Sequence, residues 1–139
     1  MFLLDTVALS ESTKSRPSQH FAKWIRVQIP ARVFMSVISL GEIERGIEAQ
    51  RSVAPEFAER LEAWRDYLIS SYADRVLALS TAISLQWGRL AQRHGHMNAD
   101  LLIAATAIEH DLTVVTRNVR HFEGTGAKVL NPFDETVSL

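Results

Sequence analysis

Short apolar runs alternate along the chain with longer segments in which apolar residues recur every three or four positions. The short runs are typical of buried strands, and the longer spacing is typical of helices that cover one face of a core. The predicted strands are residues 2–4, 33–35, 76–79, 112–115 and 129–130. Because strands and helices alternate, we expect a parallel sheet with helices on both faces.

Helix start and stop signals stand between these runs. Proline favours the first turn of a helix, and Ser or Asn caps a helix by accepting a hydrogen bond from its backbone. Glycine commonly ends a helix, and Gly95 is expected to end the helix that follows Ser80. Helices are therefore predicted after Pro17, Ser36, Pro55, Ser80 and Asn98; the helix after Ser36 runs to about residue 50, and the last runs from 99 to about 110.

Polar residues follow the predicted strands or open the helices that face the same edge of the sheet. In open parallel sheets, ligands bind beyond the carboxyl ends of the strands, near the point where the strand order reverses. The residues placed there are Asp5, Ser36, Glu42, Asp100, Thr116 and Asn118. The topology and the residue types thus predict one polar pocket.

Three of these residues, Asp5, Glu42 and Asp100, are acidic. Carboxylates in contact raise one another's pKa unless a cation lies between them, and hard ions such as Mg²⁺ and Mn²⁺ prefer oxygen ligands. Glu44 is about 200° from Glu42 around the helix and cannot share its face. Each acid also has an ordinary explanation: Asp5 in a turn, Asp100 in a helix first turn, and Glu42 on a solvated surface.

The strand end Thr116-Arg117-Asn118 offers a hydroxyl, a guanidinium and an amide at the same edge, and Ser36 offers a hydroxyl beside it. These groups suit the positioning of water or phosphate. Capping and turn formation explain them equally well.

Composition narrows the class of protein. A chain of 139 residues with 47% hydrophobic residues fits one domain that folds alone, and the absence of cysteine excludes disulfides and thiolate chemistry. The net charge of −1 argues against binding nucleic acid by bulk charge, although twelve of the fifteen basic residues are arginines suited to phosphate. With neither a span of about 20 apolar residues nor a secretory signal, the expected location is the cytoplasm.

Four ordered segments, MFLLDT, SVISLGEIERGI, ADLLIAATAIEHDLTVVTRN and NPF, resemble the PIN-domain ribonucleases, in particular VapC-type toxins and their FitB-like relatives from type II toxin–antitoxin systems. The resemblance implies one PIN domain over residues 1–139, folded as a three-layer α/β/α sandwich with about five parallel strands. It also implies Mg²⁺- or Mn²⁺-dependent hydrolysis of RNA by a metal-activated water. A VapB-like antitoxin and a homodimer, which can assemble further with the antitoxin, are the expected partners.

The resemblance carries the family's acidic positions onto Asp5, Glu42 and Asp100, with Glu42 reaching the metal directly or through water. It carries the hydroxyl positions onto Thr6, Ser36 and Thr116. Two positions depart from the family pattern. Val7 stands where many members have Asn, and His121 stands where a fourth acid is frequent, with Glu123 two residues on. A second metal site is therefore expected to be weaker or absent.

Two other functions remain open at this point. A PIN module with a depleted acidic set could bind RNA or a protein partner without cutting it. A phosphoacceptor receiver domain would need an acidic pair beside one strand, which Asp5 lacks. A dinucleotide-binding unit is disfavoured because no glycine-rich phosphate loop is present.

Trp64, Leu68 and Trp87 lie on apolar helical stripes, and we expect these to form a dimer interface.

Overall fold

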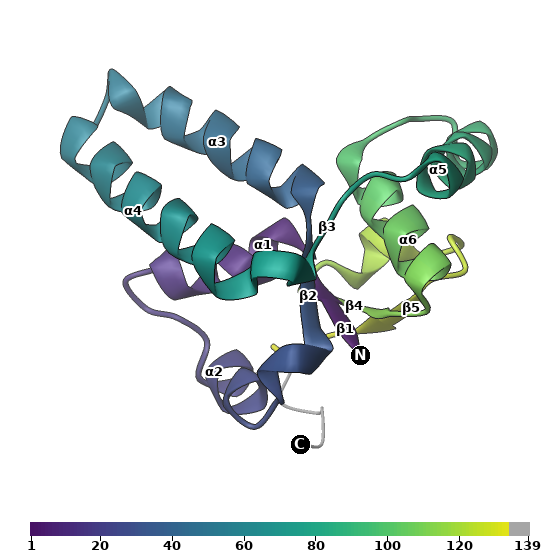
Figure 1. The fold of residues 1–139 in the computed structure, drawn as a ribbon, viewed down its shortest axis with the longest axis horizontal. Helices are drawn as coiled ribbons and strands as arrows, with labels where there is room; N and C mark the ends of the chain where they lie inside the picture. Colours follow the sequence, from purple (N-terminus) through teal and green to yellow (C-terminus); the bar gives the residue numbers. More distant parts are fainter. Residues whose placement is uncertain (134–139) are drawn as a thin grey trace.

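The strands form one five-stranded parallel sheet in a computed structural model that describes residues 1–133 (Figure 1). The order across the sheet is β3-β2-β1-β4-β5. The strands are β1 (Phe2–Leu4), β2 (Val33–Ser36), β3 (Val76–Leu77), β4 (Thr113–Val115) and β5 (Lys128–Leu130). The chain builds outward from β1 to β3 and then returns to place β4 on the other side of β1. The strand order thus reverses between β1 and β4, where ligand sites form in such sheets.

Six α-helices cover the two faces of the sheet in the described part of the chain. They are α1 (Thr6–Ser10), α2 (Gln19–Arg26), α3 (Val37–Arg51), α4 (Pro55–Tyr72), α5 (Thr81–His94) and α6 (Ala99–His110). The short 3₁₀ turns are η1 (Glu11–Thr13), η2 (Pro30–Arg32), η3 (Ala73–Arg75) and η4 (Val119–Phe122). Helices α3 and α4 lie side by side as one arm, and α5 and α6 pack together as another (Figure 1).

The predicted caps are confirmed. The side-chain oxygens of Ser36, Ser80 and Asn98 accept hydrogen bonds from backbone N–H groups in the first turns of α3, α5 and α6, each at 3.1 Å. Gly95 ends α5 with a φ of 76°, which glycine adopts without steric cost. Local sequence therefore determines where these three helices begin.

The core lies in two layers, because successive strand side chains point to opposite faces of a sheet. Leu3 and Val114 pack with α5 and α6, whereas their neighbours Leu4 and Val115 pack with α1 to α4. All four side chains are buried. The predicted three-layer α/β/α sandwich is confirmed.

Two local features differ from the sequence-based expectation. Strand β3 stops at Leu77 and not at residue 79, because its partner β2 ends at Ser36, where α3 begins. Helix α1 was not predicted, since a five-residue helix carries too few periodic positions to be recognised. The predicted single domain continues to residue 139, and its last six residues lie outside the described part. No helix among the described residues is long and apolar enough to cross a membrane.

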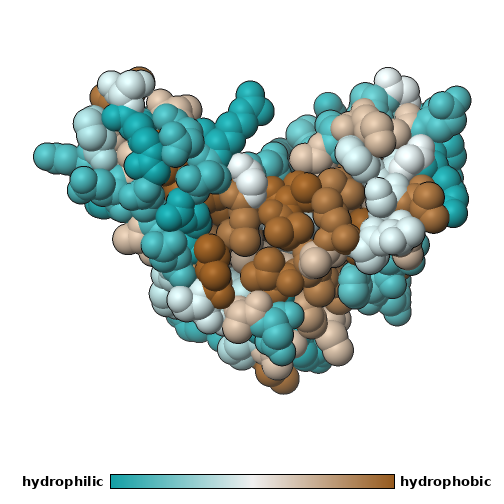
Figure 2. All heavy atoms as spheres, turned by 45° about the horizontal axis from the view of Figure 1, so that its top comes forward, coloured by the Kyte–Doolittle hydropathy of each residue, from teal (hydrophilic) through white to brown (hydrophobic). Residues whose placement is uncertain are grey.

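The side chains expected to form a dimer interface also pack within this chain, where Trp64 and Trp87 are half-buried. Leu68 is buried, Trp64 packs against the same layer, and Trp87 packs against the other layer. Figure 2 shows the apolar surface gathered in the hollow between the two helical arms. Exposed apolar side chains on the elements that border this hollow are Val37 and Leu85 on α3 and α5, and Leu79 after β3.

Candidate active site

Asp5 lies at the carboxyl end of β1, where the strand order reverses. Its backbone N–H donates to the Val115 carbonyl at 3.1 Å, which continues the pairing of β1 with β4. Its Oδ1 accepts a hydrogen bond from the Ala8 N–H at 2.8 Å and caps α1. Only 3% of Asp5 is exposed. The fold thus fixes one carboxylate at the centre of the predicted pocket.

The surroundings of Asp5 disfavour its charge. Burial raises the pKa of its carboxyl, and the negative charges of Asp100 and Glu42 raise it further. Hydrogen bonds from the Thr116 side chain and the Ala8 backbone act in the opposite direction, but the pKa remains above its ordinary value. No Lys or Arg among the described residues forms an ion pair with Asp5. Without a cation nearby, burial and the two acidic neighbours therefore make ionisation of Asp5 unfavourable.

Glu42 faces the same pocket from α3. The Thr6 hydroxyl donates to Glu42 Oε1 at 2.7 Å and lies 2.9 Å from the hydroxyl of the buried Ser39. Glu44 instead pairs with Arg65 of α4. The expected separation of Glu42 and Glu44 around the helix is confirmed.

Asp100 stands in the first turn of α6, and its partner is the residue that departs from the family pattern. Asp100 Oδ2 lies 2.9 Å from His121 Nδ1. The Asp100 side chain is 29% exposed and that of His121 is 56% exposed. His121 therefore borders the acidic pocket, on its solvent side.

The predicted polar residues divide between the pocket and the surrounding framework. Thr116 is fully buried, bonds to Asp5, and accepts from the Asn118 N–H at 2.9 Å. Ser36 is buried as the cap of α3. Asn118 takes part in this turn through its backbone N–H. The Arg117 side chain points away from the turn and pairs with Glu11, with Nη2 3.3 Å from Glu11 Oε1.

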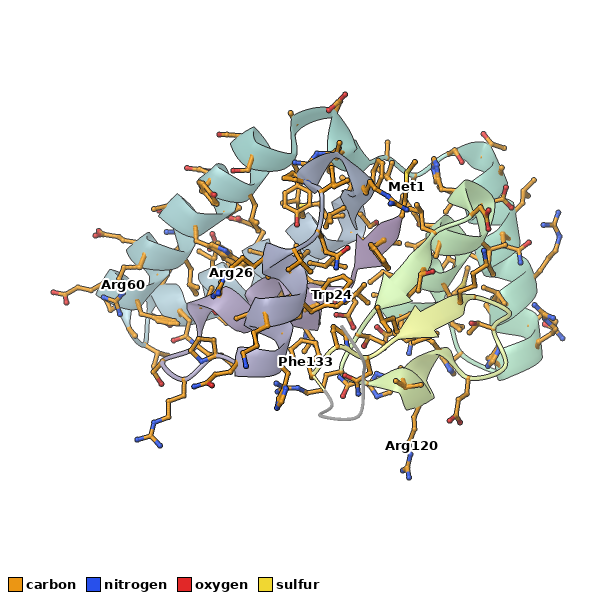
Figure 3. The ribbon with its side chains drawn as sticks, turned by 90° about the horizontal axis from the view of Figure 1, so that it is seen from below. Met1, Trp24, Arg26, Arg60, Arg120 and Phe133 are labelled. Atoms are coloured by element: carbon orange, nitrogen blue, oxygen red, sulfur yellow. The ribbon has the colours of Figure 1, made fainter. Side chains whose placement is uncertain are left out.

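Arg117 also contacts an aromatic cluster formed by Phe133 and Phe21. Its guanidinium lies 4.5 Å from the centre of the Phe133 ring, which stacks on Phe21 at 4.7 Å. Figure 3 shows Phe133 close to Trp24 on the underside of the fold, and Arg120 pointing away from the molecule. In this structure Arg117 thus links Phe133 to the N-terminal half.

The three acids surround a common space without enclosing it. Among residues 1–133, no three His, Cys, Asp or Glu side chains stand close enough to hold a metal ion as they are placed. The donor types nevertheless fit Mg²⁺ or Mn²⁺, because these ions accept carboxylate oxygens and retain several waters. An open groove of about 270 Å³ begins at Thr6 and Glu42 and runs between α3 and α4, past Trp64.

The family model described as "PIN domain" matches residues 2–128. The chain belongs to the PIN-domain family. Among curated PIN-domain relatives it is 31% identical to "VapC ribonuclease Y4jK" of Sinorhizobium fredii, with 96% of this chain and 99% of the relative covered. It is 30% identical to "Toxin FitB" of Neisseria gonorrhoeae, with 97% and 100% covered.

A solved structure agrees with these sequence matches. The crystal structure titled FitAcB from Neisseria gonorrhoeae superposes with a TM-score of 0.84 at 29% identity. The match covers 96% of this chain and 99% of that one. The PIN-like fold inferred from the four sequence segments is confirmed.

Sequence reasoning missed two residues of this PIN domain that contact predicted site residues. Ser39 lies one helical turn before Glu42 and on the same face, and this spacing was the available signal. Glu11 anchors Arg117 from 106 residues away, a separation for which no local pattern exists.

Proposed function

We propose that this PIN-domain protein is a metal-dependent endoribonuclease toxin of a toxin–antitoxin pair, which hydrolyses RNA phosphodiester bonds. The observation that carries the proposal is Asp5, a buried carboxylate whose pKa is raised and whose charged neighbours are Asp100 and Glu42. A relative named as a ribonuclease and another named as a toxin support the same activity. Such an enzyme would act in the cytoplasm.

Each side chain would have a distinct role. Asp5 and Asp100 would hold Mg²⁺ or Mn²⁺, and Glu42 would reach the ion directly or through water. The ion, when bound, lowers the pKa of water and neutralises charge on the scissile phosphate. Thr116 and Thr6 would orient Asp5 and Glu42 through the hydrogen bonds they make.

The remaining polar groups would act on the substrate or on the framework. Asn118 would present its amide to an RNA phosphate at the pocket edge. Ser36 would act chiefly by capping α3. Arg117, whose side chain is 41% exposed, would offer the outer edge of its guanidinium to a phosphate while remaining paired with Glu11. Single-stranded or looped RNA is the expected substrate, because unpaired bases can be splayed and contacted.

Cleavage of total RNA and of single-stranded oligonucleotides, with Mg²⁺ or Mn²⁺ and with EDTA, tests the proposal. We expect cleavage by the wild type, its loss with EDTA, and its loss in Glu42→Gln. Glu44→Gln is the matched control, since it changes the same residue type on the other face of α3. Metal-independent cleavage, or equal activity of the two variants, would contradict the assignment. Specific RNA binding without any cleavage would favour the binding-only module.

We also propose a VapB-like antitoxin as the partner, because a similar solved structure, at 27% identity and a TM-score of 0.84, is described as "FitAB bound to IR36 DNA fragment". The groove beside Glu42 is lined by apolar Ile43, Leu61 and Trp64, which suits an inserted protein segment. An antitoxin Arg placed against Asp5, Glu42 and Asp100 would occupy the metal's position. Inhibition should then weaken at high Mg²⁺ and on removal of that Arg.

A homodimer, assembled further with antitoxin, remains part of the proposal. The apolar hollow between the helical arms (Figure 2) is the surface available for it. Light scattering that gives a dimer mass at micromolar concentration would support the homodimer. A monomer mass independent of dilution would contradict it.

A further inference from the structure

The pocket contains one nitrogen donor among its oxygen donors. His121 stands on η4, and its Nδ1 is 2.9 Å from Asp100 Oδ2. Asp100 in turn raises the pKa of Asp5 through its charge, so the imidazole lies at the outer edge of the same electrostatic cluster. Because more than half of the His121 side chain is exposed, its ring can turn without disturbing the core.

The distance between the two side chains suits neighbouring ligands of one ion. Two ligand atoms at right angles, each about 2.1 Å from an octahedral ion, are about 3 Å apart. The observed separation of 2.9 Å between Asp100 Oδ2 and His121 Nδ1 is close to this value. The two atoms are therefore already at the spacing that one ion needs, and the exposed His121 ring has to turn so that its lone pair points at the ion and not at Asp100.

Ligand chemistry then distinguishes between the two candidate ions. Mg²⁺ prefers oxygen ligands and seldom accepts nitrogen, whereas transition metals accept imidazole as well as carboxylate. A fourth carboxylate at this place would suit Mg²⁺ and Mn²⁺ alike. An imidazole there favours the transition metal.

We infer that His121 is a nitrogen ligand of the metal site beside Asp100 and that it shifts the site's preference from Mg²⁺ towards Mn²⁺. The inference rests on the proposed function, since it takes the carboxylate pocket as a metal site. It concerns which ion is held, and it differs from a role in which His121 only neutralises Asp100. As a counter-ion, His121 would compete with a metal; as a ligand, it would help to bind one.

The test is Mn²⁺ and Mg²⁺ binding by calorimetry at mildly alkaline pH, where imidazoles are neutral. Pulsed electron paramagnetic resonance of bound Mn²⁺ would accompany it, because this method detects a directly bonded nitrogen. We expect a nitrogen coupling in the wild type and its loss in His121→Asn. His121→Asn should also weaken Mn²⁺ binding by about tenfold, while Mg²⁺ binding changes little. Removing a residue that only supports a metal ligand already costs about that much affinity, so loss of a direct ligand should cost at least as much.

His121→Asp provides the opposite change. It should abolish the nitrogen coupling and strengthen Mg²⁺ binding about fivefold, the effect of one added and partly solvated charge. His110→Asn is the matched control, because His110 is exposed at the far end of α6, about 15 Å from Asp100 along the helix. It should bind both ions like the wild type.

The outcomes separate this inference from the proposed function. The inference is overturned if the wild type shows no nitrogen coupling, if His121→Asn keeps wild-type affinity for Mn²⁺, or if it binds Mn²⁺ more tightly. The proposed function itself fails if the wild type binds neither ion, or if Asp5→Asn still binds Mn²⁺ like the wild type. Metal binding that depends on Asp5 but not on His121 would refute the inference alone.

Discussion

Asp5 and Glu11 are both buried carboxylates near the ends of α1, but the fold surrounds them differently. Glu11 is 1% exposed and has basic partners on two sides: Lys14 Nζ at 3.0 Å and Arg117 Nη2 at 3.3 Å. It also accepts a hydrogen bond from the Ser18 N–H at 2.7 Å. Asp5 is 3% exposed and has acidic neighbours instead. Although the two residues are six positions apart, the protein neutralises the charge of Glu11 and leaves that of Asp5 without a basic partner.

The pKa values express this difference. Burial acts to raise the pKa of Glu11, but the hydrogen bond from the Ser18 N–H and the positive charges of Lys14 and Arg117 hold it below its ordinary value. The pKa of Asp5 is raised because burial and neighbouring charges outweigh its hydrogen bonds. A buried acid with built-in cations serves the framework. A buried acid without them, such as Asp5, is where we propose that a cation from outside binds.

The largest expected effect is on catalysis. Asp5→Asn and Asp100→Asn should each reduce metal-dependent RNA cleavage by on the order of 100-fold or more, because several kcal/mol of charge stabilisation depends on the ion they hold. Glu11→Gln should leave the cleavage rate of the folded protein within a few-fold of wild type. Initial rates on one RNA substrate measure this, with helical content by circular dichroism as the folding control. Near-wild-type rates for Asp100→Asn would remove that residue from the site.

The next effect is on stability and falls on the other acid. Glu11→Gln should lower the free energy of unfolding by about 1–3 kcal/mol, the usual contribution of hydrogen bonds to a charged group. The partners Lys14 and Arg117 are about two-fifths exposed and can be rehydrated, which limits the loss. Urea denaturation at neutral pH measures it. An unchanged midpoint would mean that the Glu11 network contributes nothing.

A smaller change of opposite sign is expected at the first acid. Asp5→Asn keeps an oxygen for the Ala8 N–H and removes a charge that its surroundings disfavour. In metal-free protein at neutral pH we expect a gain within the roughly 0.5–2 kcal/mol that single stabilising substitutions give. Thr116→Val is the companion variant, since it removes a hydrogen bond that favours the Asp5 charge. Loss of stability in metal-free Asp5→Asn would contradict the electrostatic account.

The pH dependence separates the two acids most finely. Because the pKa of Asp5 is raised in the folded protein, its contribution to stability is fully present below the ordinary value of 3.8 and is lost as pH rises through the folded pKa. The pKa of Glu11 is lowered, so its contribution is present above the ordinary value of 4.5 and is lost as pH falls through the folded pKa. The gain in Asp5→Asn should thus disappear as pH falls towards 3.8, and the deficit in Glu11→Gln should disappear below 4.5. Urea denaturation of both variants and the wild type across this range measures the two windows, and a gain in Asp5→Asn that persists below pH 3.8 would contradict the assignment.

Sequence reasoning succeeded where the signal is local. Ser36, Ser80 and Asn98 cap helices through bonds that span two or three residues, so residue type and position were enough. Asp5 and Asp100 were placed at one sheet edge because parallel strands direct their carboxyl ends the same way.

The failures involve distant partners. The sequence could not direct Arg117 to Glu11, because that pairing depends on how the turn after β4 lies against η1. Nor could it show that Trp64 and Trp87 are half-buried against the two core layers, since core and interface residues give the same apolar stripe. Nor does the local sequence give the length of β3, which depends on where the neighbouring strand β2 ends.

The central claim is that the unpaired carboxylate, and not the paired one, makes this pocket bind a divalent cation. The most direct measurement is the rise in melting temperature of wild type, Asp5→Asn and Glu11→Gln on titration with Mn²⁺, since a ligand that binds only the folded state stabilises it. We predict a saturable rise in the wild type and in Glu11→Gln, from a lower starting temperature in the latter, and none in Asp5→Asn. An equal rise in all three proteins, or no rise in the wild type, would contradict the account.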